Sequence, residues 1–238
     1  MRARERILIA LDTSDAEQAV RWVRLLAPHV GGFKVGLELV HAAGFGIFER
    51  LREAGAERIF YDAKLHDIPN TVARAVRAIA QRGVWMVNVH ASGGRAMMEA
   101  AVESARSVPN PPLLVAVTVL TSLSERELHV ELGVRRGLRT QVVQLARLAQ
   151  ESGVDGIVAS AQEAAILRKQ IGRDLLVITP GIRLAEEGAH DQKRVTTPAG
   201  AVRAGADYLV IGRSVTADAE PLQKVQRIVE EIAGGADG

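Results

Sequence analysis

The sequence predicts an α/β protein, a single (β/α)8 barrel of the TIM type in which residues 1–238 form one domain. Three observations indicate this fold. Short apolar segments that suit strands alternate with amphipathic helical stretches, without a shift in composition between parts of the chain. The length of 238 residues lies in the range of such barrels. Finally, a doubly wound open sheet would need a glycine-rich loop after its first strand, where this chain has Asp12-Thr13-Ser14-Asp15, a helix cap.

The predicted strands are runs rich in apolar, β-branched or aromatic residues. The third, Arg-Ile-Phe-Tyr-Asp, is typical of a buried strand that ends in a polar residue. Parallel strands in a barrel bring all their carboxyl ends to one mouth, so the ends of these segments are where a site is expected. The eight strands are expected at residues 7–12, 32–36, 58–62, 85–90, 113–118, 156–160, 176–179 and 208–211.

The segments between the strands repeat apolar residues at helical spacing. Pro69, followed by Asn70 and Thr71, is typical of the first turn of a helix. Two connections, 121–137 and 181–197, are too long to be simple linkers, so we expect one or both to close over a ligand. The clearest helices are expected at residues 16–26, 71–81, 96–104, 140–150, 161–170 and 221–232.

The composition excludes several kinds of protein. With no cysteine, the chain can form no disulfide, thiolate metal site or cysteine nucleophile, which favours a cytoplasmic location. No apolar run is long enough to span a membrane, and the one that follows the basic N-terminus is too short for a signal peptide. A net charge of +2, 3% aromatic residues and no basic stripe argue against nucleic-acid binding.

The most informative stretch of the chain is residues 62–69, which places the ammonium of Lys64 between two carboxylates at the end of a predicted strand. Side chains two apart on a strand face the same way, so Asp62 and Lys64 can converge if the extended conformation continues through them. Burying such charges is unfavourable without a purpose. Polar residues collect at the ends of the first four strands: Asp12, Lys34, Asp62, Lys64, Asp67, Asn88 and His90.

The opposite side of the predicted barrel offers groups for an anion. The seventh strand is followed by Pro180-Gly181-Ile182-Arg183 and the eighth by Gly212-Arg213-Ser214. Barrels commonly hold a phosphate with the loops after these two strands. Gly212 lets a phosphate approach the backbone, and Arg183 or Arg213 can make a bidentate contact. We therefore expect a phosphate group to bind here.

The histidines do not indicate a metal site. His29, His41, His66, His129 and His190 lack the spacing of metal ligands and are expected on the surface or in loops. Asp62 and Asp67 could hold a magnesium ion, but Lys64 between them already neutralises their charge, so no metal and no cofactor is expected.

Several motifs together resemble the orotidine 5′-phosphate decarboxylase family, over nearly the whole chain. The Asp-x-Lys-x-x-Asp pattern is shared with other sugar-phosphate barrels, and the Ile68-Pro69-Asn70-Thr71 that follows is the discriminating part. The other matching segments are 7–12, 33–36, 88–94, 120–122, 180–183 and 211–213. The resemblance implies a cofactor-free enzyme of pyrimidine nucleotide biosynthesis that converts orotidine 5′-phosphate to uridine 5′-phosphate and carbon dioxide.

The resemblance also implies a role for each matching residue. Lys64 would donate the catalytic proton within an array of Lys34, Asp62, Lys64 and Asp67. The neighbouring subunit of a homodimer would supply Asp67, Ile68 and Thr71. Asp12 and Lys34 would contact the ribose, and Thr121 and Ser122 the pyrimidine. The phosphate would be bound by Gln192, Gly212 and Arg213, with Arg183 at the same end. The loop from Gly181 would close over the phosphate.

Two alternatives stay open from the residues. One is a magnesium-dependent decarboxylase or aldolase that acts on a sugar phosphate, with Asp62 and Asp67 near the metal. The other is a non-catalytic phosphate-binding barrel, for which a broken charge array would be expected, whereas the array in this sequence is intact.

Overall fold

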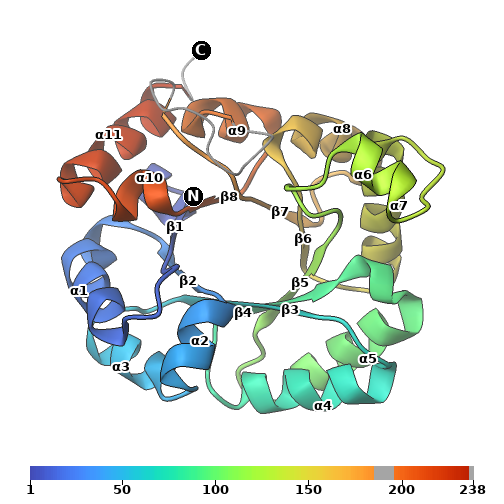
Figure 1. The fold of residues 1–238 in the computed structure, drawn as a ribbon, viewed down its shortest axis with the longest axis horizontal. Helices are drawn as coiled ribbons and strands as arrows, with labels where there is room; N and C mark the ends of the chain where they lie inside the picture. The colour runs from blue at the N-terminus through green and yellow to red at the C-terminus, as the bar shows by residue number, and fades with distance from the viewer. Residues whose placement is uncertain (185–195, 236–238) are drawn as a thin grey trace.

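The structure, a computed structural model, describes residues 1–184 and 196–235. Its strands form a closed parallel barrel in the order β1 to β8, with the helices in a ring outside (Figure 1), which confirms the predicted (β/α)8 fold. The strands are β1 Ile7–Ala10, β2 Gly32–Val35, β3 Ile59–Leu65, β4 Met86–His90, β5 Leu113–Val117, β6 Gly156–Val158, β7 Leu176–Thr179 and β8 Tyr208–Ile211.

The six predicted helices are present with small differences at their ends. The side chain of Asp15 caps the first, accepting hydrogen bonds from the backbone N–H groups of Glu17 at 2.8 Å and Gln18 at 3.1 Å. The α-helices are α1 Ala16–Leu26, α2 Leu37–Ala43, α3 Ile47–Glu53, α4 Pro69–Ala80, α5 Arg95–Arg106, α6 Glu125–Val130, α7 Leu138–Glu151, α8 Ala161–Ile171, α9 Pro198–Ala204, α10 Arg213–Thr216 and α11 Pro221–Gly234, and short 3-10 helices lie at Ala3–Arg6 (η1), Ala27–His29 (η2) and Ala91–Gly93 (η3).

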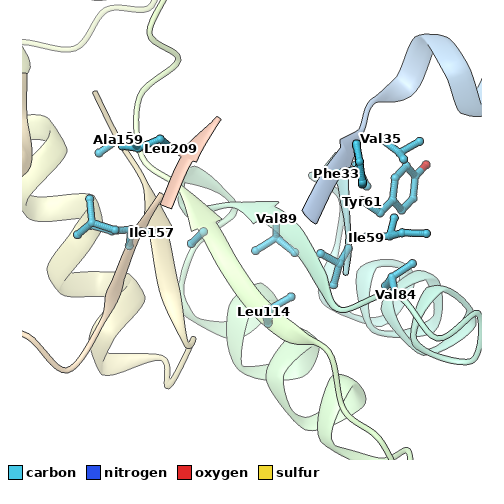
Figure 2. Close-up of a cluster of buried hydrophobic side chains, with 14 of the residues drawn as sticks. Phe33, Val35, Ile59, Tyr61, Val84, Val89, Leu114, Ile157, Ala159 and Leu209 are labelled. Atoms are coloured by element: carbon cyan, nitrogen blue, oxygen red, sulfur yellow. The ribbon is translucent and has the colours of Figure 1, made fainter. Parts of the chain in front are cut away.

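Side chains alternate between two apolar clusters along each strand. The outer cluster packs the barrel against its helices, and Figure 2 shows part of it, with Phe33, Val35, Ile59 and Tyr61 gathered on β2 and β3. The inner cluster fills the barrel, and its members are Leu8, Ala10, Phe60, Met86, Val115, Ile178, Tyr208 and Val210. Because strand side chains alternate with a period of two, the residues two positions beyond the inner ones also face inward, now at the mouth. This parity directs Asp12, Asp62, Asn88 and Gly212 to one place.

Strand β3 differs from its prediction. It continues to Leu65, and its register with β4 shifts, since Tyr61 pairs with Val87 while Leu65 pairs with Val89. The extra residues form a bulge in which Lys64 takes a left-handed conformation, with φ of 48°. Asp62 and Lys64 therefore do converge, but through a bulge and not through a continued extended conformation.

The two long connections differ from simple loops. The first contains α6, whose Ser124 and Glu127 form a capping box, so it is locally helical. The second begins and ends close together, because Ile182 bridges to Thr196. Residues 185–195, and with them the predicted phosphate ligand Gln192, lie outside the described residues. Among the helices of the described ranges, none is both long and apolar enough to cross a membrane.

Candidate active site

A chain of ion pairs crosses three adjacent strand ends at the mouth of the barrel. Lys34 Nζ lies 2.8 Å from Asp12 Oδ1 and 3.5 Å from Asp62 Oδ2. Lys64 Nζ lies 2.7 Å from the other carboxylate oxygen of Asp62, Oδ1. The structure thus brings together four of the residues predicted from the sequence, with positive and negative groups alternating in space.

Lys34 and Asp62 keep their charges despite burial. Burial disfavours the charge on Lys34, but Asp62 and Asp12 outweigh it and hold the pKa of Lys34 above its usual value. Burial likewise opposes ionisation of Asp62, yet the ammonium groups of Lys34 and Lys64 hold the pKa of Asp62 below its usual value. The side chains of Lys34 and Asp62 are only 10% and 13% exposed, whereas that of Lys64 is 34% exposed. Lys64 is therefore the more accessible cation of the array.

Asn88 on β4 supports this array from below. Its side-chain nitrogen donates to Asp62 Oδ1 at 2.7 Å, and its side-chain oxygen accepts the backbone N–H of Lys64 at 2.7 Å. Asn88 is fully buried. The carboxylate of Asp62 is thus bonded on three sides, by Lys34, Lys64 and Asn88.

Gly36, just after β2, leaves room for the array. A Cβ atom at this position would lie 3.3 Å from Lys34 Nζ and 3.5 Å from Asp12 Oδ1. A side chain there would press on the ammonium of Lys34 and reach toward its carboxylate partner, so glycine gives this pair its space.

A cavity of about 550 Å³ opens above the array, a size suited to a small molecule. Its floor is apolar and includes Phe60, Val117 and Val210 from inside the barrel. The predicted site residues that line it are Asp12, Lys34, Asp62, Lys64, Thr121, Ser122, Arg183, Gly212 and Arg213. One cavity therefore joins the charged array to the expected anion-binding end.

The anion-binding end lies after β7 and β8. Arg183 is buried, and its backbone N–H donates to the carbonyl of Thr196 at 3.2 Å, which fixes the start of the connection. Gly212 precedes α10, and a Cβ atom there would lie 3.5 Å from Asp12 Oδ2, so this backbone faces the array. Arg213 is exposed at the rim. These positions fit the contacts that a bound phosphate needs.

Three predicted site residues stay outside the cavity of their own chain. Asp67, Ile68 and Thr71 are exposed, and Ile68 is 66% exposed. Asp67 accepts a hydrogen bond from the backbone N–H of Ile68 at 2.6 Å, and in the described chain no ion pair joins it to Lys64. Within the described chain, Lys64 therefore pairs with Asp62 of this run, and the expected contribution of Asp67 to a partner subunit stays a prediction.

Sequence reasoning missed other residues at the site. Glu38 and Ser214 also line the cavity. Glu38 lies on α2, a helix too short to give a periodic signal, and Ser214 follows the predicted Gly212-Arg213 motif directly.

Two histidines lie against each other near the charged array. His66, expected in a surface loop, is exposed, and its ring lies 5.6 Å from that of His90 at the end of β4. Burial and the neighbouring His66 and Lys64 hold the pKa of His90 below its usual value, although Asp62 opposes this. Over residues 1–184 and 196–235, no cluster of three or more histidine, aspartate or glutamate side chains could hold a metal ion.

The fold and the site together define a class of protein, a (β/α)8-barrel enzyme with paired charges at the carboxyl ends of its strands. A match to the orotidine 5′-phosphate decarboxylase / HUMPS family spans residues 5–228. The chain belongs to this family.

Relatives and solved structures agree with this assignment. Proteins called orotidine 5′-phosphate decarboxylase from Hahella chejuensis and Chromobacterium violaceum are 50% and 48% identical to this chain over 227 residues, which cover 95% of this chain and 97% and 91% of theirs. The crystal structure of orotidine 5′-phosphate decarboxylase from Lactobacillus acidophilus matches with a TM-score of 0.83 at 36% identity, covering 95% of this chain and 98% of that one.

Proposed function

We propose that this chain decarboxylates orotidine 5′-phosphate to uridine 5′-phosphate and carbon dioxide, in pyrimidine nucleotide biosynthesis and without a cofactor. The observation that carries the proposal is the array in which Asp62 holds Lys34 at 3.5 Å and Lys64 at 2.7 Å beneath one cavity. Family membership and the names of the relatives support the same substrate.

The reaction requires electrostatic stabilisation of the negative charge that develops on C6. When the bond from C6 to the carboxylate carbon breaks, its electron pair stays on C6 in the plane of the ring, where the π system cannot delocalise it. The ammonium of Lys64 stabilises this developing charge and then donates a proton to C6, completing the product. The carboxylate of Asp62, near that of the substrate, disfavours the ground state and promotes departure of carbon dioxide.

The other cavity residues bind and orient the nucleotide. Asp12 and Lys34 contact the ribose hydroxyls, while Thr121 and Ser122 contact the pyrimidine. The phosphate is held by Gln192, Gly212 and Arg213, with Arg183 at the same end. Binding energy from the phosphate, remote from C6, helps to close the connection from Gly181 and to hold the charges together.

A homodimer completes each site. Asp67, Ile68 and Thr71 reach the cavity of the partner subunit, where Asp67 extends the array beside Lys64. Two observations support this arrangement: all three residues are exposed and away from their own cavity, and Ile68 is a large apolar side chain that is 66% exposed.

The test is a spectroscopic assay with orotidine 5′-phosphate, which follows the pyrimidine absorbance as carbon dioxide leaves. EDTA-treated protein is expected to turn over substrate at the same rate as untreated protein. Activity that vanishes with EDTA and returns with magnesium would instead favour the metal-dependent reading. No turnover at all would point to a non-catalytic barrel.

Subunit mixing tests the shared site. Lys64→Ala and Asp67→Ala proteins are each expected to be inactive, but a hybrid dimer has one site with both native residues. Random exchange should therefore restore about a quarter of the wild-type rate, since half of the dimers are hybrid and each has one intact site. If verified exchange restores nothing, the two residues act within one chain.

A further inference from the structure

Asn88 lies at the point where β3 leaves its register with β4. Its neighbours Val87 and Val89 pair with Tyr61 and Leu65, so Asn88 faces the bulge between them. It is fully buried, and it bonds both to the side chain of Asp62 and to the backbone of Lys64, each at 2.7 Å.

The orientation of this amide is fixed by its partners. The backbone N–H of Lys64 can only donate, and the ionised carboxylate of Asp62 can only accept. The side-chain oxygen of Asn88 must therefore face Lys64 and its nitrogen must face Asp62, as the structure has them. A side chain that can only donate would bond Asp62 alone, and one that can only accept would bond the N–H of Lys64 alone.

The backbone of Lys64 needs this support. Its φ of 48° lies in the left-handed region, which is unfavourable for a lysine. The bulge also takes the N–H of Lys64 out of the regular strand ladder, and a buried N–H without an acceptor is unfavourable. The oxygen of Asn88 replaces that lost acceptor.

We propose that Asn88 is a positioning residue, which sets the place of the Lys64 ammonium and the orientation of the Asp62 carboxylate. It binds one residue through the backbone and the other through the side chain, so it fixes the two groups relative to each other. This inference rests on the proposed function, because its consequence is measured as turnover. Asn88 itself does not line the cavity and acts through its two partners.

Two variants and one control test the proposal. Asn88→Asp keeps the acceptor for Lys64 but replaces the donor to Asp62 with a like charge, and Asn88→Ala removes both bonds. Thr118→Val is the control, since it removes another buried side-chain bond in the same barrel, from Thr118 Oγ1 to the carbonyl of Val158 at 3.0 Å. Measured quantities are kcat, KM, affinity for uridine 5′-phosphate and melting temperature.

Loss of positioning should appear in kcat, because the phosphate end of the cavity is untouched. At pH 8, kcat of both Asn88 variants is expected to fall on the order of 100-fold, the loss typical of a misplaced catalytic group, while product affinity changes little. The control should keep the wild-type kcat.

The pH profile separates positioning from simple loss of stability. In Asn88→Asp, the introduced carboxyl lies beside Asp62, so its pKa rises, and when protonated it can donate to Asp62 as the amide does. The ratio of variant to wild-type kcat should therefore rise as the pH falls from 8 to 6 for Asn88→Asp, and stay flat for Asn88→Ala. Wild-type kcat in both variants, or equal loss at every pH, would overturn the proposal.

A crystal structure of Asn88→Ala gives a readout that does not depend on activity. The backbone of Lys64 is expected to leave the left-handed region and the ammonium to move from Asp62. If Lys64 instead kept φ near 48° and its 2.7 Å contact, the inference would fail even where the wild-type enzyme is active. A wild-type protein that does not turn over orotidine 5′-phosphate would overturn the proposed function alone, and this structure would still decide the role of Asn88.

Discussion

The barrel holds an ion-pair cluster at each end, and the two are built differently. At the amino ends of the strands, Arg168 pairs with Asp207 and also donates to the carbonyls of Gly205 at 2.9 Å and Leu175 at 2.7 Å. Asp207 in turn accepts the backbone N–H of Val177 at 2.8 Å. At the carboxyl ends, Lys34 is as deeply buried as Arg168 and Asp62 is more deeply buried than Asp207, but Lys64 has Asp62 as its single ion-pair partner in the described chain.

The two pairs differ in how many of the cation's donors have partners within the protein. The guanidinium of Arg168 donates to the backbone carbonyls of Gly205 and Leu175, so it holds the segments before β8 and β7 against the barrel. The ammonium of Lys64 has three donors, makes one ion pair, and faces a cavity of about 550 Å³. Burial and pairing are common to both pairs, so the donors of Lys64 that face the cavity are what supports its proposed role.

Replacing the lysine at the mouth should have the largest effect on activity. Lys64→Ala is expected to lower kcat on the order of 10⁴-fold, because it removes the group proposed to stabilise and protonate the carbanion. Its melting temperature and its affinity for uridine 5′-phosphate should change little, and both can be measured on the same protein. Lys169→Ala, which changes an exposed lysine, serves as the matched control and should keep full activity. Near-normal turnover in Lys64→Ala would contradict the proposed role of Lys64 as the proton donor.

Breaking the pair of Arg168 and Asp207 should lower stability and leave kcat unchanged. Arg168→Ala leaves the carboxylate of Asp207 without its cation, although 26% exposure of that side chain lets water compensate in part. We expect the free energy of unfolding to fall by about 3 kcal/mol, the low end for a broken buried pair, with kcat per folded molecule retained. Urea unfolding with assays of the folded fraction measures both. A large loss of kcat at unchanged stability would contradict the distinction between the two clusters.

The smallest expected effect is a pH dependence of the free energy of unfolding that comes from His90 at the mouth of the barrel. The pKa of His90 is lowered in the folded protein, so as the pH falls through about 6.5 the unfolded chain takes up a proton that the folded chain resists. The free energy of unfolding should therefore decrease below that pH, by less than about 1.4 kcal/mol per pH unit, the slope for one whole proton. Urea unfolding between pH 8 and 5 should show this slope, and His90→Gln should flatten it. An unchanged slope in the variant would assign the effect to another group.

The sequence predicted the barrel and much of the site because both depend on short-range periodicity. Alternation within strands directs Asp12, Lys34 and Asp62 inward, and the order of strands brings them together. Helices α2 and α3 were not predicted, since seven residues hold too few turns for a periodic signal.

The missed features depend on contacts that no local pattern contains. The left-handed backbone of Lys64 is one example, since its N–H donates to the side chain of Asn88 on another strand. In the same way, the position of Asp67 relative to Lys64 depends on the direction that the backbone takes after the bulge. That a partner subunit receives Asp67 stays a prediction.

The strict order of strands around the barrel has a consequence for engineering. Asp12, Lys34, Asp62 and Lys64 all precede β5, whereas Arg183, Gly212 and Arg213 follow β7. The proposed proton donor and the proposed phosphate ligands therefore lie in separate stretches of the chain. A chimaera that joins the segment through β4 to the corresponding later segment of a relative is expected to exchange the proposed phosphate ligands and to keep Lys64 together with Asn88. Recombination after β4 should therefore alter phosphate binding while the charged array keeps its geometry.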